Sequence, residues 1–457
     1  MRYLLKNGTV VSGEKSEQMD ILIEGEKIAA VGHDLQAEDA KVIDAEGKLL
    51  FPGFIDGHTH FDLEVAGTVT ADDFETGTKA AILGGTTLVI DYASQDKGGH
   101  TLKEGLEKWH QKADNKCSCD YSFHMSIVEW NEKTEAEVQD MIDQGITSFK
   151  LYMTYPAMIV NDCDMYKILK KLGECGCFAG VHCENAGVID ALIDEAKKAG
   201  RLGPENHPLV RPDDMEAEAV HRLLVIAKEA KASVMVVHLT NKKALEEVRR
   251  ARKAGQTVYA ETCPQYLLLE DSVYSKPDFQ GAVYVCAPPI RKKEDQECLW
   301  KALAEEELQT IATDQCSFTL AQKALGKEDF TKIPGGLPGV QTRGTLLYTY
   351  GVREGRITQE QMCKFLSENP AKLYGVYPQK GVIAPGSDAD IVLLDPKKES
   401  TISAATHAYN TDNNPFEGFE LKCGIDKVFL RGNLAVDDGK LVQEKLGKYI
   451  FRGKKQI

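Results

Sequence analysis

The middle of the chain alternates short apolar runs with longer stretches whose apolar residues recur at helical spacing. Eight of the apolar runs have the length and composition of buried strands. In chain order they are FPGFIDGHTH, TTLVIDYA, DYSFHMSIV, ITSFKLYMT, CFAGVHCEN, SVMVVHLT, TVYAETCPQYL and LQTIATDQ. Between most of them lie amphipathic segments, such as EAEVQDMIDQG at residues 135–145 and KKALEEVRRARKAG at residues 242–255. Strands that alternate with helices in this way predict an α/β fold, a (β/α)8 barrel of the TIM type.

A doubly wound parallel sheet is the competing α/β fold for such an alternation. That fold has a glycine-rich, phosphate-binding turn directly after its first strand. The residues that follow the first apolar run, FDLEVAGTVTADD, lack this fingerprint. We therefore expect the barrel, over residues 53–374.

The two ends of the chain have a different pattern, in which apolar and polar residues alternate over short stretches. Turn dipeptides such as NG and EG separate these stretches. The N-terminal stretches are YLLKNGTVV, DILIEGEKIAAVG and KVIDAEGKLLFPG, and the C-terminal ones are GVIAPGSDADIVLLDP and DKVFLRGNLAVDDGKLV. Because the two ends are alike, we expect residues 1–52 and 375–457 to meet. They would form one small β-sandwich domain with a C-terminal tail.

The composition narrows the choice of partners and compartment. The 457 residues carry 55 basic and 70 acidic side chains, a net charge of −15, without a block of like charges. A nucleic acid or an anionic membrane would need a basic surface, so neither is expected as a partner. No apolar stretch resembles a secretory signal or reaches the length of a bilayer span. The twelve cysteines contain no CxxC pair, which favours a reducing cytoplasm over a disulfide framework.

Polar residues end several of the predicted strands, and in a (β/α)8 barrel the chemistry lies at those carboxyl ends. His58 and His60 end the first strand, and their spacing points both side chains to one face. The complete set at the strand ends is His58, His60, Lys150, His182, His238 and Asp314. His124 lies within the third strand, and we expect it to be structural or to support the metal ligands without binding metal itself. We expect the remaining histidines to be solvated, namely His33, His100, His110, His207, His221 and His407.

Four imidazoles and a carboxylate that converge inside a barrel need partners, and a divalent cation satisfies all of them together. Nitrogen and oxygen ligands without a thiolate favour Zn²⁺, with Mn²⁺, Fe²⁺ or Co²⁺ as substitutes. Lys150 allows two interpretations, because an ammonium beside metal ions would be repelled. It lies in a peripheral salt bridge, or burial deprotonates it and the neutral amine adds carbon dioxide to become a carbamate between two metal ions.

The motifs around these residues resemble the amidohydrolase superfamily, and in particular its dihydropyrimidinase and hydantoinase branch. The resemblance covers nearly the whole chain, with the motifs in the same order and at similar spacing. They are GHTHFDL, GTVTADDFETGTKAA, GGTT, SFKLYMTY, ETCPQYL, PPIR, GLPGV and PGSDADIVLLDP. Taken together these motifs are specific to the branch, whereas PGSDADIVLLDP alone indicates only an amidohydrolase.

The resemblance implies a two-metal site and roles for individual residues. One metal ion would be held by His58, His60, Lys150 and Asp314, and the other by carboxylated Lys150 (N6-carboxylysine), His182 and His238. Tyr155 would hydrogen-bond the oxygen that becomes negative, and Asp314 would transfer the proton. Main-chain groups at Ala287 and Gly335 would bind the imide edge of a substrate ring. The resemblance also implies a homotetramer, or else a homodimer.

Four positions depart from the pattern of that branch. The family usually has histidine at Gln315, asparagine at Gly335, glutamate at Gln341 and a bulky aromatic residue at Val65. These changes leave the predicted metal ligands intact but alter their surroundings and the pocket. Gln315 cannot take up a proton, so Asp314 would perform the proton transfer alone.

The activity implied is the hydrolytic opening of a small cyclic amide, a hydantoin or a 5,6-dihydropyrimidine, to an N-carbamoyl amino acid. An allantoinase-type ureide hydrolase is an alternative, since allantoin is itself a substituted hydantoin. A dihydroorotase would need cationic residues for the substrate carboxylate, and no arginine near a strand end clearly fits. The collapsin-response mediator proteins share the fold as non-enzymatic interaction proteins. They are recognised by lost metal ligands, whereas this chain has all of them.

Overall fold

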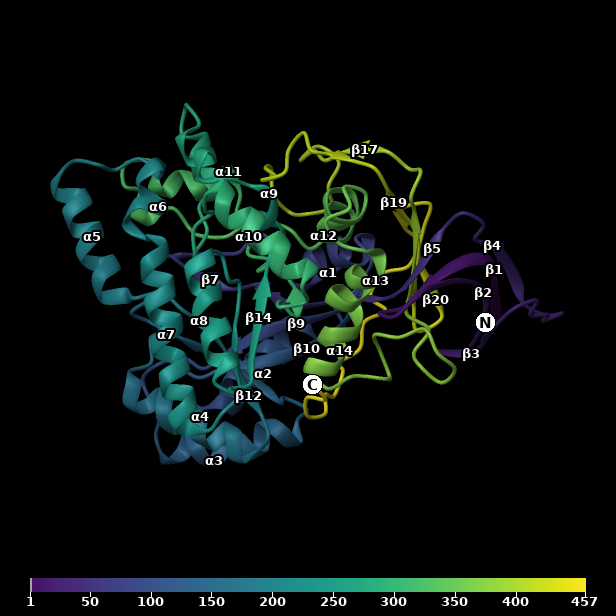
Figure 1. Ribbon diagram of the computed structural model, residues 1–457, viewed down its shortest axis with the longest axis horizontal. Coiled ribbons are helices and arrows are strands. Elements are labelled where there is room, and N and C mark those ends of the chain that lie inside the picture. Colours follow the sequence, from purple (N-terminus) through teal and green to yellow (C-terminus); the bar gives the residue numbers. More distant parts are fainter. Residues whose placement is uncertain (1) are drawn as a thin grey trace.

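A barrel of eight parallel strands forms the larger part of the molecule (Figure 1). The computed structural model describes residues 2–457, so that Met1 of the predicted terminal domain lies outside the described part. The barrel strands are β6 (Phe54–Thr59), β9 (Thr86–Ser94), β10 (Asp120–Ser126), β11 (Ser148–Tyr152), β12 (Phe178–His182), β13 (Val234–Val236), β14 (Val258–Thr262) and β15 (Thr310–Ile311). Each coincides with one of the eight predicted runs, β9 extending one residue beyond its run, and they neighbour one another in sequence order, which confirms the predicted barrel.

The first and last strands approach each other just beyond their carboxyl ends. There the main-chain N–H of His60 donates to the Gln315 carbonyl at 2.8 Å, and the N–H of Gln315 donates to the His58 carbonyl at 3.3 Å. These two bonds close the barrel at the level of the predicted site. His58, His60 and the segment after β15 are thereby held in a fixed register.

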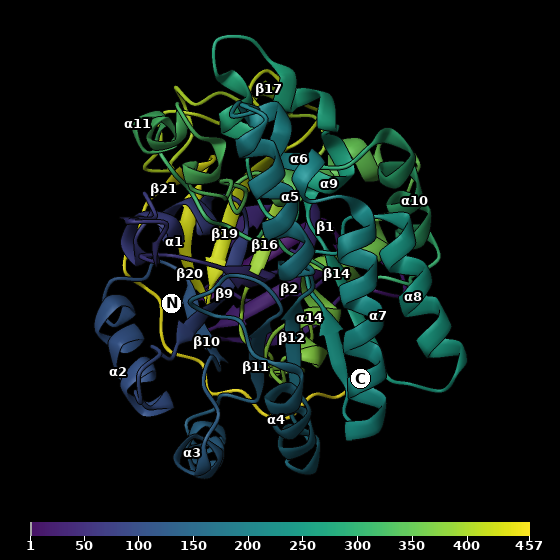
Figure 2. The same cartoon turned by 90° about the vertical axis from the view of Figure 1, so that its left-hand side faces the viewer.

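Helices cover the outside of the barrel, as Figure 2 shows. They are α1 (Phe74–Leu83), α2 (Leu102–Ala113), α3 (Glu132–Asp143), α4 (Asp162–Glu174), α5 (Ala186–Lys198), α7 (Asp213–Ala230), α8 (Lys242–Lys253) and α10 (Lys293–Ala304). Helix α8 buries Ala244, Leu245, Val248 and Ala251, which share one face at helical spacing. Asn241 begins this helix by accepting a hydrogen bond from the Ala244 N–H. The amphipathic stretches predicted as helices are therefore helices.

Shorter elements build the loops and the end of the barrel. Around the carboxyl ends of the strands lie β7 (Glu64–Val65), β8 (Thr68–Val69), η1 (Pro204–Asn206), α6 (His207–Val210), α9 (Pro264–Leu268), η2 (Asp271–Ser275), η3 (Gln280–Tyr284), α11 (Leu320–Lys323), η4 (Ala324–Gly326) and η5 (Phe330–Lys332). The last helical segment consists of α12 (Arg343–Leu347), η6 (Tyr348–Val352), α13 (Gln359–Cys363), η7 (Lys364–Glu368) and α14 (Asn369–Leu373). Among residues 2–457, no helix is both long and apolar enough to cross a membrane.

Strands from both chain ends form a second sheet, at the right of Figure 1. Its members are β1 (Arg2–Val11), β2 (Ser16–Glu24), β3 (Lys27–Gly32), β4 (Lys41–Asp44), β5 (Leu49–Pro52), β16 (Ile391–Asp395), β19 (Gly424–Leu430), β20 (Asn433–Asp437) and β21 (Lys440–Leu441). The two ends meet where β5 pairs with β16 in antiparallel fashion. The terminal strands thus form a separate β domain, as the sequence predicts, and they belong to one continuous hydrogen-bonded sheet. A short pair, β17 (Ser400–Thr401) and β18 (Glu420–Leu421), brackets a loop above the barrel.

Strand β16 explains how this sheet is attached to the barrel. Ile391 and Leu393 belong to the apolar core of the terminal domain, whereas Val392 and Leu394 belong to the core shared with the barrel. Alternate residues of a strand point to opposite faces. Both faces of β16 are therefore buried, and the sheet packs against the barrel over an apolar layer.

The C-terminal tail closes the end of the barrel opposite to the site. The N–H of Ile450 donates to the Tyr121 carbonyl at 2.8 Å, and the N–H of Gly453 donates to the Gly375 carbonyl at 2.8 Å. The buried Arg452 guanidinium donates to the Ser122 hydroxyl at 2.9 Å, to the Ser148 hydroxyl at 2.8 Å and to a main-chain carbonyl. Ser122 and Ser148 lie near the starts of β10 and β11, so this arginine fixes the base of the barrel.

We expect Arg452→Met to lower the free energy of unfolding by about 2–4 kcal/mol, because it removes charged hydrogen bonds inside the base of the barrel. Urea unfolding followed by circular dichroism measures the effect. Lys454→Met, two residues further along and exposed, is the matched control and should change the stability little. A loss in Arg452→Met no larger than that of the control would show that the guanidinium does not hold the base together.

Candidate metal centre

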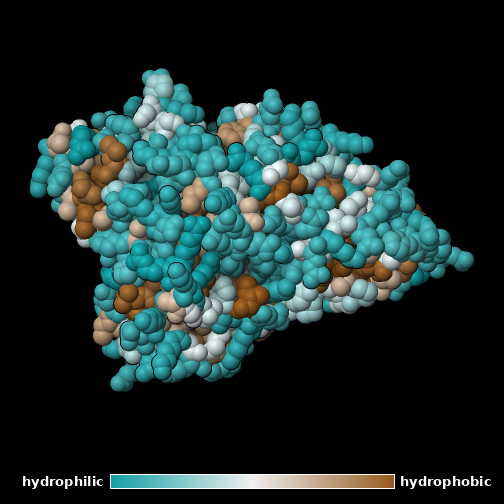
Figure 3. Space-filling model, in the orientation of Figure 1, coloured by the Kyte–Doolittle hydropathy of each residue, from teal (hydrophilic) through white to brown (hydrophobic). Residues whose placement is uncertain are grey.

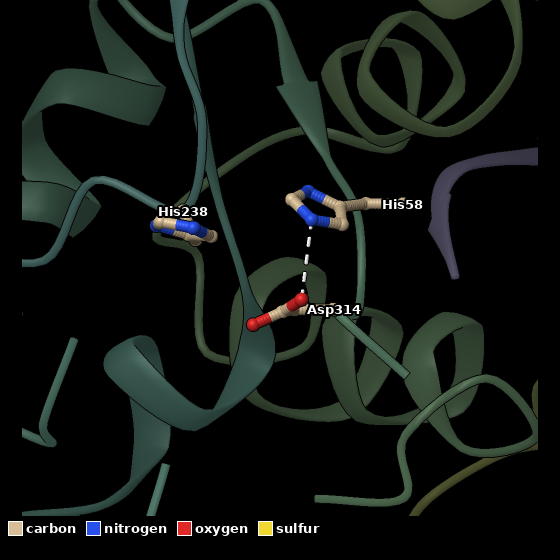
Figure 4. A group of neighbouring side chains, drawn as sticks. All are labelled: His58, His238 and Asp314. Carbon is tan, nitrogen blue, oxygen red and sulfur yellow. Dashed lines mark ion pairs between the residues drawn. The ribbon is translucent and has the colours of Figure 1, made fainter. Parts of the chain in front are cut away.

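The residues predicted at the strand ends come together inside the carboxyl end of the barrel. His58 lies on β6, Lys150 on β11 and His182 at the end of β12, while His238 and Asp314 lie just after β13 and β15. One ligand atom each from His58, His238 and Asp314 lie within 4.8 Å of one another. Figure 4 shows these three side chains facing a common space, with Asp314 paired to His58.

Asp314 lies between the two histidines of the first strand. Its Oδ1 is 3.1 Å from Nε2 of His58 and 3.2 Å from Nε2 of His60. The amine of Lys150 lies 3.4 Å from the same Nε2 of His58. His58 therefore faces both the carboxylate and the lysine.

His182 and His238 form the other side of the site. Their ring centroids are 4.6 Å apart, and the ring of His238 is 5.4 Å from that of His58. All six predicted ligands are thus brought to one place, on strands that are far apart in the sequence. The arrangement has two sides, with His58, His60 and Asp314 on one and His182 and His238 on the other.

Two glutamates orient the histidines from behind. Nδ1 of His58 lies 2.7 Å from a carboxylate oxygen of Glu261, and Nε2 of His182 lies 2.7 Å from Glu184. The Arg211 guanidinium donates to the same oxygen of Glu184 at 2.7 Å. Carboxylates behind metal-binding histidines fix the ring and its tautomer. These glutamates were not among the predicted residues. Glu184 lies just after β12 and could have been found from that place, whereas Glu261 lies within β14 (Val258–Thr262).

Tyr92 packs against several members of the site. Its ring stacks on His60, with centroids 5.0 Å apart, and on His124, with centroids 4.6 Å apart. The amine of Lys150 lies 4.7 Å from the centre of the Tyr92 ring. Tyr92 was not predicted either, because an aromatic residue inside an apolar strand carries no distinguishing signal.

Three site residues have a left-handed backbone. The φ angles are 40° at His238, 54° at Asp314 and 66° at Tyr155. Non-glycine residues adopt this conformation rarely, and such residues cluster at functional sites. The fold therefore accepts local strain to aim these side chains inward.

The pKa values of the site residues shift in different directions. Burial lowers the pKa of Lys150 to about 8 and the pKa of His60 to about 4, and it also lowers the pKa of His182 and His238. Burial would raise the pKa of Asp314, but the charge of His58 and the hydrogen bonds from His58 and His60 hold it well below its usual range. For His58, Asp314 and Glu261 outweigh burial and the Lys150 charge, so its pKa is raised.

A divalent metal ion fits this set of residues. Nδ1 of His238 is buried and has no hydrogen-bond partner among the described residues. A lone pair left without a partner in a buried site is costly, and a metal ion removes that cost. Neutral imidazoles and a carboxylate are also the donors that Zn²⁺ and similar ions bind.

The other histidines follow the expectations only in part. His124 bonds to the Ser148 hydroxyl at 2.6 Å and the Gly57 carbonyl at 2.9 Å, which is a structural role inside the barrel. His33, His100 and His221 are exposed, whereas His110 and His407 are half-buried. The prediction for His207 was wrong. This residue begins the short helix α6 and is buried against Tyr274, with ring centroids 5.7 Å apart, and its Nε2 bonds to the Cys286 carbonyl at 2.7 Å.

The predicted substrate-binding residues lie on loops beside the histidines. The centres of the Tyr155 and His182 rings are 5.1 Å apart, and the Arg211 guanidinium is 5.9 Å from the centre of the Tyr155 ring. Ala287 is half-buried and Gly335 is exposed. Their two segments touch, because the N–H of Gly336 donates to the Val285 carbonyl at 2.9 Å. Their contact with a substrate stays a prediction.

Comparison with known proteins agrees with this geometry. The pattern of the amidohydrolase family matches residues 49–435, which is most of the chain. The chain belongs to the amidohydrolase family. A D-hydantoinase of Geobacillus stearothermophilus is 44% identical over 458 residues, which cover 99% of this chain and 97% of that protein. A D-hydantoinase of Streptomyces coelicolor is 41% identical, covering 97% of this chain and 96% of its own.

Solved structures place this amidohydrolase in the same branch. The dihydropyrimidinase from Brevibacillus agri NCHU1002 superposes with a TM-score of 0.98 at 43% identity and covers 100% of this chain and 99% of its own. The L-hydantoinase (dihydropyrimidinase) from Arthrobacter aurescens gives a TM-score of 0.89 at 28% identity, and the match covers 98% of this chain and 99% of that protein. The resemblance to the dihydropyrimidinase and hydantoinase branch is therefore confirmed.

Of the four positions predicted to depart from the branch pattern, Gln315 and Gln341 hold loops in place. Gln315 donates through Nε2 to Asp72 at 3.2 Å, and its Oε1 accepts from the N–H groups of Gly339 at 2.7 Å and Val340 at 3.1 Å. The Gln341 side chain accepts from the N–H of Ala408 at 2.8 Å, in the loop above the barrel. Val65 lies in the short β7–β8 hairpin, half-buried. Gln315 therefore connects three loops through neutral hydrogen bonds.

We expect His58→Ala and His182→Ala to lose bound metal while the barrel stays folded, since each removes one donor from a different side of the site. Elemental analysis of purified protein, with circular dichroism on the same sample, measures both properties. His221→Ala, which changes an exposed histidine, is the control and should keep the metal. Full metal content in either site variant would contradict the assignment.

Proposed function

We propose that the protein hydrolyses a ring amide bond of a cyclic amide, a hydantoin or a 5,6-dihydropyrimidine, to give an N-carbamoyl amino acid. The observation that carries this proposal is the convergence of His58, His60, Lys150, His182, His238 and Asp314 at the carboxyl end of the barrel. The relatives named hydantoinase or dihydropyrimidinase supply the substrate class. A turnover panel of dihydrouracil, hydantoin, 5-substituted hydantoins and allantoin tests it. Opening of none of these rings by metal-loaded protein would refute the proposal.

Two divalent metal ions, most simply Zn²⁺, would occupy the two sides of the site. His58, His60, Lys150 and Asp314 would hold one ion, and Lys150, His182 and His238 the other. When bound, such ions polarise a carbonyl and lower the pKa of water toward ~7, so that hydroxide is available at neutral pH. Support comes from the separation of the ligands into two sides and from the position of Lys150 beside His58.

Lys150 would join the two sides as a carbamate. Its amine nitrogen bonds to the carbon of carbon dioxide, one proton leaves the nitrogen, and an anionic two-oxygen group results. The step needs a neutral amine, and burial lowers the pKa of Lys150 to about 8, which leaves a neutral fraction at physiological pH. Among the described residues Lys150 has no ion pair with a carboxylate, which argues against the alternative of a peripheral salt bridge.

Asp314 would act as the proton carrier. Its depressed pKa keeps it ionised, and the hydrogen bonds from His58 and His60 hold its Oδ1 in the site. It would accept the proton of the attacking water and deliver it to the ring nitrogen as the C–N bond breaks. Gln315 beside it has no titrating group, so Asp314 would carry the proton without help from that neighbour.

Tyr155 would stabilise the negative charge that develops on the ring carbonyl. Burial raises the pKa of Tyr155 well above its usual value, so the phenol stays protonated and can donate a hydrogen bond. The Arg211 guanidinium, held by Glu184, lies over the Tyr155 ring, 5.9 Å from its centre. Donors aimed at a developing oxyanion give large rate effects.

Main-chain groups at Ala287 and Gly335 would hold the imide edge of the ring. Main-chain contacts tolerate a change of side chain, so glycine at position 335 can keep this role.

The rival functions are less well supported. The relatives carry hydantoinase and dihydropyrimidinase names, so allantoin is a control in the panel and not the favoured substrate. A non-enzymatic role is not favoured, because all six ligand positions are filled.

We also propose that the protein works as a homotetramer, or else a homodimer, in the reducing cytoplasm. Free cysteines, most of them buried, support the compartment. Val188 of α5 and Leu209 of α6 are exposed apolar residues, and Figure 3 shows an apolar area over this part of an otherwise largely hydrophilic face. Such an area is typical of a contact surface. Analytical ultracentrifugation measures the oligomeric state.

The carbamate on Lys150 should be visible as the added mass of one carbon dioxide in native mass spectrometry. Lys150→Ala should lose both the added mass and most of the metal, because the anionic bridge is gone. Short carboxylic acids, which supply a two-oxygen anion, should restore part of the activity of this variant. An unmodified Lys150 in active, metal-loaded protein would contradict the bridge.

The roles of Tyr155 and Asp314 can be separated by kinetics. Tyr155→Phe should lower kcat by about two to three orders of magnitude with unchanged metal content, since only a hydrogen bond to the oxyanion is lost. Asp314→Asn should be worse, because it removes the proton carrier and weakens a metal ligand together. If Tyr155 were only a wall of the pocket, phenylalanine would serve equally well and turnover would be near normal.

A further inference from the structure

Lys323, at the end of α11, is a buried lysine that has no carboxylate partner among residues 2–457. Its amine donates to the main-chain carbonyls of Val285, Pro334 and Gly336, each at 2.9 Å. An ammonium has three N–H donors, so all of them are used. Burial lowers the pKa of Lys323 to about 8, which leaves it mostly charged at neutral pH.

The three carbonyls belong to two segments that lie side by side. Val285 stands two residues before Ala287, and Pro334 and Gly336 flank Gly335. The N–H of Gly336 also donates directly to the Val285 carbonyl at 2.9 Å. Lys323 therefore ties together the two segments whose main chain is proposed to bind the imide edge of the substrate.

The second segment needs such a tie because it contains two consecutive glycines. Glycine has more backbone freedom than other residues, so Gly335 and Gly336 do not fix their own conformation. At Gly336, φ is 150° and a Cβ would lie 2.3 Å from the Cys316 carbonyl oxygen, so no larger residue fits there. The far end of the segment is held by Gln315 and by the Cys316 N–H, which donates to the Leu337 carbonyl at 3.0 Å. Lys323 holds the near end.

We propose that Lys323 is a positioning residue for substrate binding, whose ammonium fixes the separation of segments 285–287 and 334–336. The site would thereby fit the flat edge of a cyclic imide. This inference rests on the proposed function for the identity of the ligand. The hydrogen bonds of Lys323 go to main-chain carbonyls and to none of the predicted metal ligands. Its loss should therefore weaken binding of the ring more than it slows the chemical step.

Lys323→Met tests this, because methionine is also long and apolar along its stem but has no donor. We expect amide hydrogen exchange at residues 285–287, 333 and 335–337 to become about tenfold faster or more, since each lost hydrogen bond is worth about 1 kcal/mol. KM for the preferred ring should rise by about tenfold while kcat changes less than about threefold. Metal content should stay the same. Lys327→Met, an exposed lysine four residues further along, is the matched control and should change none of these quantities.

Lys323→Gln keeps two N–H donors and should lie between the wild type and Lys323→Met in both measurements. It also provides the test if the methionine variant does not fold. If amide hydrogen exchange in the two segments is unchanged in the variants, Lys323 does not hold the segments together. If exchange is faster but KM is unchanged, Lys323 has no role in substrate binding. If the wild type opens none of the rings, the proposed function fails, while hydrogen exchange still decides whether Lys323 fixes the segments.

Discussion

The structure depends on holding several polar side chains inside a barrel mouth that excludes most water. His58 is fully buried, and both of its ring nitrogens face polar groups, Glu261 on one side and Asp314 with Lys150 on the other. Buried polar groups cost free energy unless they are paired. The pairing requires β6, β11, β14 and β15 to keep their registers, since a slip by one residue would turn a side chain to the opposite face of its strand. The two hydrogen bonds between the segments after β6 and β15 fix that register at the site itself.

The contacts at the base of the barrel and with the terminal sheet stabilise the fold away from the site. At the base, the Arg452 side chain and the C-terminal tail cover the starts of the barrel strands. Beside the barrel, the terminal sheet packs over an apolar layer through Val392 and Leu394. Neither contact reaches the carboxyl ends of the strands. The opposite end is therefore left to loops, which is the usual division in (β/α)8 barrels.

Much of this arrangement could be predicted from the sequence, because the information was local. Strand positions followed from apolar runs of strand length, and the meeting of the predicted ligands followed from their place at strand ends. Three other residues could not be found in this way. Glu261 lay within a predicted strand, His207 was expected to be solvated, and nothing in the sequence set Lys323 apart from other lysines. Each takes its role from contacts with residues far along the chain, such as His58, Cys286 and Val285. A single sequence does not display such contacts.

The same long-range contacts leave room for the predicted departures from the branch pattern while the site stays in place. The predicted ligands lie on or directly after strands, whereas Gln315, Gln341 and Lys323 act on loops by hydrogen bonds to main-chain groups. Gln315 uses both ends of its amide for Asp72 and for the N–H groups of residues 339 and 340, so no titrating group is needed at that position. Main-chain hydrogen bonds do not depend on which side chains the loops carry. Substitutions at Val65 or Gly335 can therefore reshape the rim of the pocket while the ligands stay where the strands place them. We therefore expect the loops at the rim to govern which ring is bound, whereas the strands hold the predicted ligands.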